Sequence, residues 1–139
     1  MPDWSVRFVR TALIALATGF GLGAVLLLAG AGVIPALPPW LRPAHVEVLL
    51  VGWFVQLVLG VAWWIFPRHV RGTPRGNPRV MPVAFVLLNG GLLIYITGLA
   101  GSSAMAVLAG RLAEWVAVVA VAAQLLFRIR GSRLEKLSR

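Results

Sequence analysis

Few side chains in this sequence could do chemistry, and most of them lie within or beside long apolar runs. His45 precedes one such run, and neutral imidazole is the commonest protein ligand for metals. Arg111 and Glu114 lie inside another run, where an ionised side chain is costly unless it is paired. Cysteine is absent, which excludes disulfides, iron–sulfur clusters and thiolate metal sites. The sequence therefore offers one histidine-centred site and one charged pair, without a motif typical of soluble enzymes.

His45 has two interpretations. It is either an interfacial histidine bonded to the adjacent turn or to water, or a ligand to a metal or a haem iron. On a helical wheel it shares a face with Gly52 and Gly60, where a flat macrocycle or another helix could lie close. Glu47 falls on the opposite, apolar face with Val51, which we expect to meet lipid. We therefore do not expect Glu47 and His45 to share a metal.

Arg111 and Glu114 are three residues apart and so lie on one helix face. One interpretation is a charged pair that faces the other helices. The other is that Arg111 binds an anionic group such as a haem propionate, because it is expected in the same membrane leaflet as His45. His69 lies roughly 35 Å from His45 along a helix and cannot share a metal with it. Interhelical hydrogen bonds are expected from the remaining polar residues, Gln56, Asn89, Tyr95, Thr97 and Gln124.

The composition indicates a membrane protein. Of 139 residues, 60% are hydrophobic and 12% are charged, whereas about a quarter of an ordinary globular chain is charged. A helix needs ~20 apolar residues to cross a bilayer. Four segments meet this length, and we expect helices at about 8–34, 44–66, 81–100 and 104–127. The first is longer than the apolar part of a signal peptide, so we expect it to be kept. The predicted fold is an all-α integral membrane four-helix bundle, with residues 1–139 as a single domain.

Basic residues set the expected orientation. The loop 67–80 and the tail 128–139 are rich in arginine and lysine, and such segments stay on the cytoplasmic side. We therefore expect both termini in the cytoplasm, in an inner (plasma) membrane of the bacterial type. The net charge of +9 is explained by these ends and by anionic headgroups, so no nucleic-acid partner is expected. Gly19 and Gly23, four residues apart, predict a surface where another helix approaches closely, which favours a homo-oligomer.

The segment LRPAHVEVLLVGWFVQLVLGVAWWIFPR, residues 41–68, resembles the second helix of the catalytic subunit of the haem–copper oxidase superfamily. The nitric oxide reductase and cbb-type branches are the most similar. The resemblance rests on an arginine before the histidine, His45, Gly52-Trp53, Gly60, Trp63-Trp64 and Pro67-Arg68. It implies that His45 is an axial ligand of a low-spin haem b near the outer surface. The family's other metal ligands lie in later helices and have no counterpart here, so this chain alone is not expected to reduce oxygen or nitric oxide.

The leading hypothesis is a small haem-b-binding or redox-accessory membrane protein, with the bilayer around it and a respiratory-chain protein as partner. His45 would bind the iron and Arg111 a propionate. The sixth ligand would be His45 of a second copy, Met105, or none. The alternative is a cofactor-free structural or assembly protein, and the third hypothesis is an oligomeric transporter or channel.

Overall fold

The computed structural model describes residues 1–66 and 77–137, with side chains described as far as residue 127. The elements within these ranges are all helical. In chain order they are α1 (Asp3–Gly30), α2 (Leu41–Glu47), η1 (Val48–Val55), α3 (Gln56–Ile65), α4 (Val80–Ala100) and α5 (Ala104–Leu137). Because α2, η1 and α3 follow one another without a break, they form a single span. The prediction of an all-α protein is confirmed, and the described parts contain four helices long and apolar enough to cross a membrane.

The helix ends differ from the predicted ones. α1 begins at Asp3, where the carbonyl oxygen of Pro2 accepts the first helical bond from Val6. It ends at Gly30, and the chain then turns through Gly32, whose φ of 73° is left-handed and suits glycine. The helical backbone of α5 continues past the predicted end at residue 127 to Leu137, so much of the basic tail extends this helix. Most of the predicted basic loop, with His69, lies outside the described residues.

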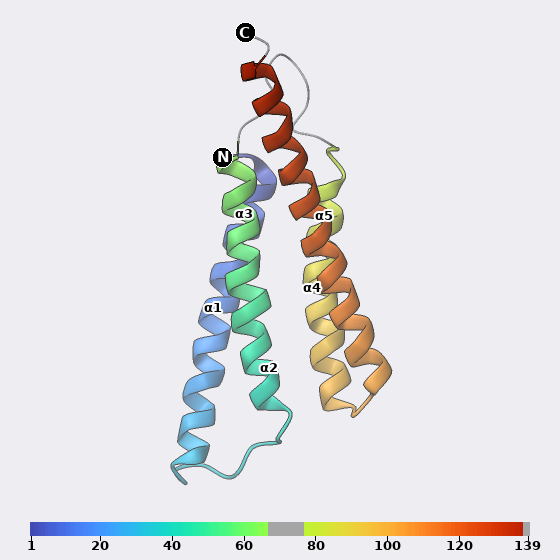
Figure 1. The fold of residues 1–139 in the computed structure, drawn as a ribbon. Helices are drawn as coiled ribbons and strands as arrows, with labels where there is room; N and C mark the ends of the chain where they lie inside the picture. Colours follow the sequence, from blue (N-terminus) through green and yellow to red (C-terminus); the bar gives the residue numbers. More distant parts are fainter. Residues whose placement is uncertain (67–76, 138–139) are drawn as a thin grey trace.

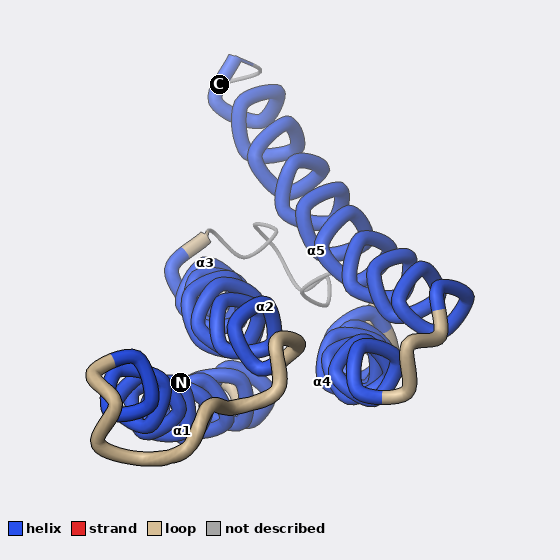
Figure 2. Tube along the Cα trace, turned by 90° about the horizontal axis from the view of Figure 1, so that it is seen from below, coloured by secondary structure: helices blue, strands red, loops and turns tan. Residues whose placement is uncertain are grey.

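The four spans form two antiparallel hairpins. Figure 1 shows α1 beside α2 and α3, and α4 beside α5, with the start of α1 and the far end of α5 at the same end of the molecule. The turns 31–40 and 101–103 lie at the opposite end (Figure 1). The end-on view in Figure 2 shows the hairpins next to each other and α5 slanting outward. One apolar core draws on all four spans, from Phe8, Val51, Leu59, Trp63, Met81, Ala84, Leu88, Ala117, Val121 and Leu125.

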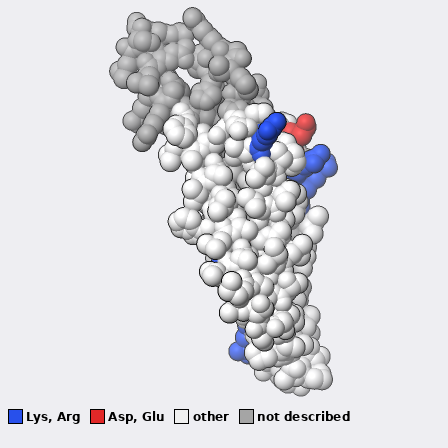
Figure 3. Space-filling view, turned by 90° about the vertical axis from the view of Figure 1, so that its right-hand side faces the viewer, with Lys and Arg blue, Asp and Glu red and all other residues white. Residues whose placement is uncertain are grey.

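The outer surface is strongly apolar along most of its length. On the face seen in Figure 3, the coloured charges gather near the two ends and the middle is almost entirely white. Large apolar side chains point outward from every span, for example Ile14, Phe54, Val86 and Leu126. Exposure of an apolar surface of this extent to water would be unfavourable for a monomer, whereas the same surface is compatible with contact to lipid. The structure is therefore that of a multi-pass membrane protein in contact with the bilayer.

Glycines bring the helices of each hairpin close together. A Cβ atom on Gly110 would lie 2.7 Å from the carbonyl oxygen of Gly91, so α4 and α5 pack backbone against backbone here. In the other hairpin, Gly19 faces Leu49 and Gly23 faces His45. The predicted close approach at Gly19 and Gly23 is confirmed, and the partner is the second span of the same chain. This surface is therefore already covered and does not by itself support a homo-oligomer.

The second span contains a π-helix, η1, directly after Glu47. π-Helices are rare and occur often at functional sites. The helical wheel assumes a regular α-helix throughout the span and places Glu47 and Val51 on the side that faces lipid. This placement of the two residues is wrong. Both residues are buried, because the α4–α5 hairpin packs against them, whereas Phe54 and Ile65 of the same span are exposed.

Candidate functional site

His45 is fixed by a hydrogen bond to the neighbouring span. Its Nδ1 atom lies 2.9 Å from the carbonyl oxygen of Gly19 on α1. A carbonyl oxygen only accepts, so Nδ1 carries the proton and donates it to this bond. In a neutral imidazole, this tautomer leaves the lone pair on Nε2. Metal-binding histidines are held in the same way, with the second ring nitrogen bound to a carbonyl or carboxylate that sets the tautomer.

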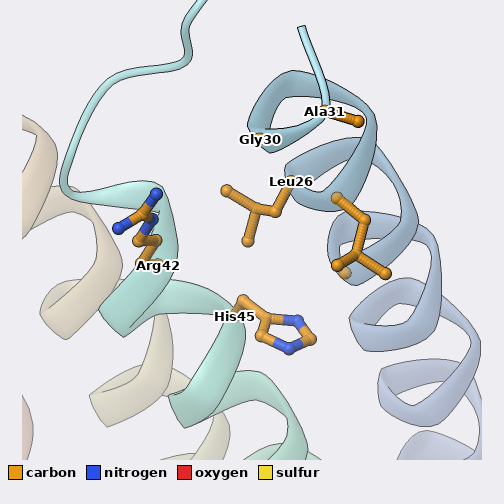
Figure 4. A pocket seen from close by; sticks show the side chains of 7 residues that line it. Leu26, Gly30, Ala31, Arg42 and His45 are labelled. Atoms are coloured by element: carbon orange, nitrogen blue, oxygen red, sulfur yellow. The ribbon is translucent and has the colours of Figure 1, made fainter. Parts of the chain in front are cut away.

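The same ring lines a cavity of about 610 Å³ between the end of α1 and the start of the second span. Figure 4 shows His45 reaching from α2 toward α1, with Arg42 on the preceding turn and Leu26 on the facing helix. Gly23 and Gly30 also line the cavity, and because they have no side chains, the backbone of α1 forms the wall at these positions. The cavity thus combines an apolar wall with one imidazole and one guanidinium.

These residues fit a haem better than a bare metal ion. Within the described part of the chain, no three His, Cys, Asp or Glu side chains gather to hold a metal. A porphyrin brings four nitrogen ligands of its own, and from the protein it needs an axial ligand and a cation for its propionates. His45 and Arg42, which line the cavity, are side chains of these two kinds. The remaining lining residues, which are Gly23, Leu26, Leu27, Gly30 and Ala31, carry no second axial ligand.

Arg111 lies in a different cluster, where it joins the two hairpins. Its Nη1 donates to Oε1 of Glu47 in a close ion pair, and Glu47 is only 2% exposed. Its Nη2 donates to the Tyr95 hydroxyl at 3.2 Å, and its guanidinium carbon lies 4.3 Å from the centre of that ring. The predicted neighbour, Glu114, is also present, at 3.7 Å from Nη1. Sequence reasoning missed Glu47 as the principal partner, because nothing in the sequence marks contacts between the two hairpins.

Of the predicted cofactor residues, the structure places only His45 at the cavity. Arg111 does not line it, and its guanidinium is held by Glu47 and Tyr95. Met105 begins α5 on the other hairpin, is 76% exposed and does not line it either. Within one copy, the structure therefore brings Arg42 to His45 in place of Arg111 and Met105.

The other polar residues divide between two kinds of contact. Gln56 is fully buried, and its Nε2 lies 3.5 Å from the carbonyl oxygen of Phe8 on α1, so it bonds between helices as expected. Tyr95 does the same through Arg111. Asn89 and Thr97 instead donate to carbonyls four residues earlier in their own helix. For these two side chains the prediction of interhelical bonds is wrong, because a turn of their own backbone is nearer.

No family model, curated protein or solved structure matches this chain. The resemblance of residues 41–68 to haem–copper oxidases remains a prediction from the sequence.

Proposed function

We propose that this protein binds haem b in the membrane and serves a redox-accessory role, with His45 as the axial ligand through Nε2. The observation that carries the proposal is the Nδ1–H bond from His45 to the Gly19 carbonyl, which selects the tautomer of the neutral imidazole with its lone pair on Nε2, at a cavity also lined by Arg42. His45 would bind the iron and Arg42 would pair with a propionate. The glycines on α1 would let the flat ring approach the helix. A bound haem would supply one-electron transfer.

The wider arrangement follows the sequence. Both termini lie in the cytoplasm, by the positive-inside rule, so the cavity is at the outer side of a bacterial-type inner membrane. His45 is the residue among those lining this cavity that would bind the iron, so a second protein ligand would come from His45 of a second copy, or there would be none. A homo-oligomer would provide that ligand, and a respiratory-chain protein would exchange the electron.

The test is a reduced-minus-oxidised visible spectrum of the detergent-purified protein from haem-replete cells. We expect a Soret band and α-band in the wild type that His45→Ala removes. His69→Ala is the matched control, since it removes the chain's other histidine and should leave the spectrum unchanged. A featureless wild-type spectrum, or a haem signal that survives His45→Ala, would overturn the proposal.

A second candidate is a cofactor-free structural or assembly subunit. The observation that favours it is the same His45–Gly19 bond, because it also holds the second span against α1. His45→Gln separates the two, since the amide keeps a donor for packing and lacks the imidazole nitrogen that iron prefers. A structural role predicts that His45→Gln folds like the wild type and that neither protein carries haem.

A further inference from the structure

Arg111 has hydrogen-bond donors that the fold leaves unused. A guanidinium carries five N–H groups and accepts no hydrogen bond. One N–H is donated to Oε1 of Glu47 and one to the Tyr95 hydroxyl, while Oε2 of Glu114 lies 3.7 Å from Nη1, beyond hydrogen-bond distance. The described residues provide no acceptor for the other N–H groups, although the side chain is 46% exposed. An N–H group without an acceptor is costly in a membrane, so an acceptor from outside the chain would be stabilising here.

Arg111 also lines a cavity of about 320 Å³ between η1 and α5. The walls of this cavity are mostly apolar, with Val51 and Val55 on η1 and Val119 on α5. Trp115, one turn after Arg111, lines it too and is 73% exposed, so the cavity opens at the surface that faces lipid. A molecule dissolved in the bilayer could therefore enter it, with a flat ring along the indole and an acceptor at the guanidinium.

We infer that this cavity binds a membrane-soluble quinone, through a carbonyl oxygen that accepts a hydrogen bond from an unused N–H of Arg111. The site is separate from the His45 cavity and does not depend on the function proposed there.

The charges around the guanidinium favour a neutral acceptor over an anion. Glu47 and Glu114 are both buried beside Arg111. An anionic ligand such as a fatty acid would bring a third carboxyl group to one guanidinium, and like charges held together in a membrane are costly. A carbonyl oxygen brings no net charge, and its hydrogen bond from a charged donor is of the stronger kind.

The depth of Arg111 favours a quinone over the ester group of a phospholipid. Arg111 lies about two turns into α5, which begins at Ala104, so it is about 10 Å along the helix axis from that end. The ester groups of phospholipids lie in the interfacial region, at the edge of the hydrocarbon core. The ring of a quinone dissolves within the hydrocarbon and so reaches the cavity from the side.

The experiment is equilibrium dialysis of the detergent-purified protein against menadione, a small naphthoquinone, with the same detergent concentration on both sides so that partition into micelles cancels. The chain has no cysteine, so menadione cannot form a thiol adduct. We expect saturable binding of one molecule per chain. 1,4-Dimethylnaphthalene, which has methyl groups in place of the carbonyl oxygens, should bind at least about tenfold more weakly, the worth of one hydrogen bond to a charged group. Equal affinity for both compounds, or no saturable binding of menadione, would overturn the inference.

Two further compounds separate the alternative occupants. 2-Naphthoate has a similar ring and a carboxylate, and it should bind more weakly than menadione because Glu47 and Glu114 repel it. An excess of phosphatidylcholine should leave menadione binding unchanged, since its ester groups stay at the interface. Tighter binding of the naphthoate would make the ligand an anion, and displacement of menadione by the lipid would assign the cavity to a phospholipid. Either result would refute the quinone site.

Two variants locate the binding. Arg111→Met combined with Glu47→Gln and Glu114→Gln removes the donors while the cluster stays neutral, and it should lower the affinity for menadione at least about tenfold.

Val119→Phe narrows the cavity from an exposed position while Arg111 stays, so it should abolish binding even if the triple variant fails to fold. Val116→Phe makes the same change at an exposed position of α5 that does not line the cavity. Binding that survives Val119→Phe, or is lost equally in Val116→Phe, would place the quinone elsewhere and refute the site.

Discussion

Arg111 of α5 forms an ion pair with Glu47 of α2, across the boundary between the two hairpins. The core of apolar residues also crosses this boundary, but Glu47 and Arg111 are the residues that link the hairpins by charge within the described residues. Glu47 is buried, whereas the Arg111 side chain is 46% exposed. Removal of Arg111 would therefore leave the buried Glu47 carboxyl without its counter-charge, which is the costly way to break such a pair. The stability of the fold should therefore depend on keeping the cluster neutral.

Replacement of Arg111 tests this dependence. Arg111→Met leaves two buried carboxyls with no guanidinium, so the free energy of unfolding should fall by about 3–5 kcal/mol. The change is measured by unfolding the protein in micelles of a mild detergent with increasing amounts of a denaturing detergent. Arg10→Met, on an exposed part of α1, is the control. The triple variant that adds Glu47→Gln and Glu114→Gln should recover much of the loss, and an Arg111→Met protein as stable as Arg10→Met would contradict the interpretation.

The glycine contact inside the second hairpin gives a second prediction. Gly110→Ala would place a Cβ 2.7 Å from the Gly91 carbonyl oxygen and force α4 and α5 apart, at a cost of about 1–3 kcal/mol. Gly90→Ala is the control, because nothing lies within 4 Å of its new methyl group. The same unfolding assay should show a loss for the first variant and none for the second. Equal stability of the two would show that the helices do not approach this closely.

A third prediction links packing to the haem site. In Gly23→Ala, the new Cβ would lie 2.9 Å from Cε1 of His45, so the imidazole must move from its position against α1. If His45 holds haem, the Soret band should shift or disappear in this variant. Gly21→Ala, in the same helix, meets nothing within 4 Å and should leave the spectrum as it is. Identical spectra for the two variants would mean that the iron is bound elsewhere.

The membrane orientation can be tested because the chain has no cysteine. Ser102→Cys places one thiol in the exposed turn between α4 and α5, and Ser132→Cys places one in the basic C-terminal part. On intact cells, a membrane-impermeant maleimide should label the first and reach the second only after lysis, since basic segments stay inside. The reverse pattern would invert the topology and move the His45 cavity to the cytoplasmic side.

The four spans were predictable because a run of about 20 apolar residues in a membrane usually forms a helix that crosses it. The close approach at Gly19 and Gly23 could also be predicted, since small residues four apart suit helix contacts. The side of the second span could be predicted only in part. His45 meets another helix, α1, on the side where the wheel allows one to lie close, whereas Glu47 is buried where lipid was expected.

The errors have a common physical cause. A helical wheel describes one helix, and it cannot show which other helix lies beside it. Arg111 has Glu114 three residues away, but it binds more closely to Glu47, which lies 64 residues away in the chain. The π-helix at Val48–Val55 is equally hidden, because its residues would also suit an ordinary α-helix. Arg42 could have been found as a partner of His45 from its position one turn earlier on the same helix.

The glycine contacts within each hairpin also bear on how the protein is made. The two helices of each hairpin have close contacts with each other, so they can pack together as soon as both have left the translocon. The contact between Glu47 and Arg111 needs the last span, which is synthesised after the first hairpin is complete. Until α5 is inserted, the Glu47 carboxyl group lies in an incomplete bundle without its counter-charge, Arg111. The arrival of α5 is thus the step that commits the chain to its final assembly.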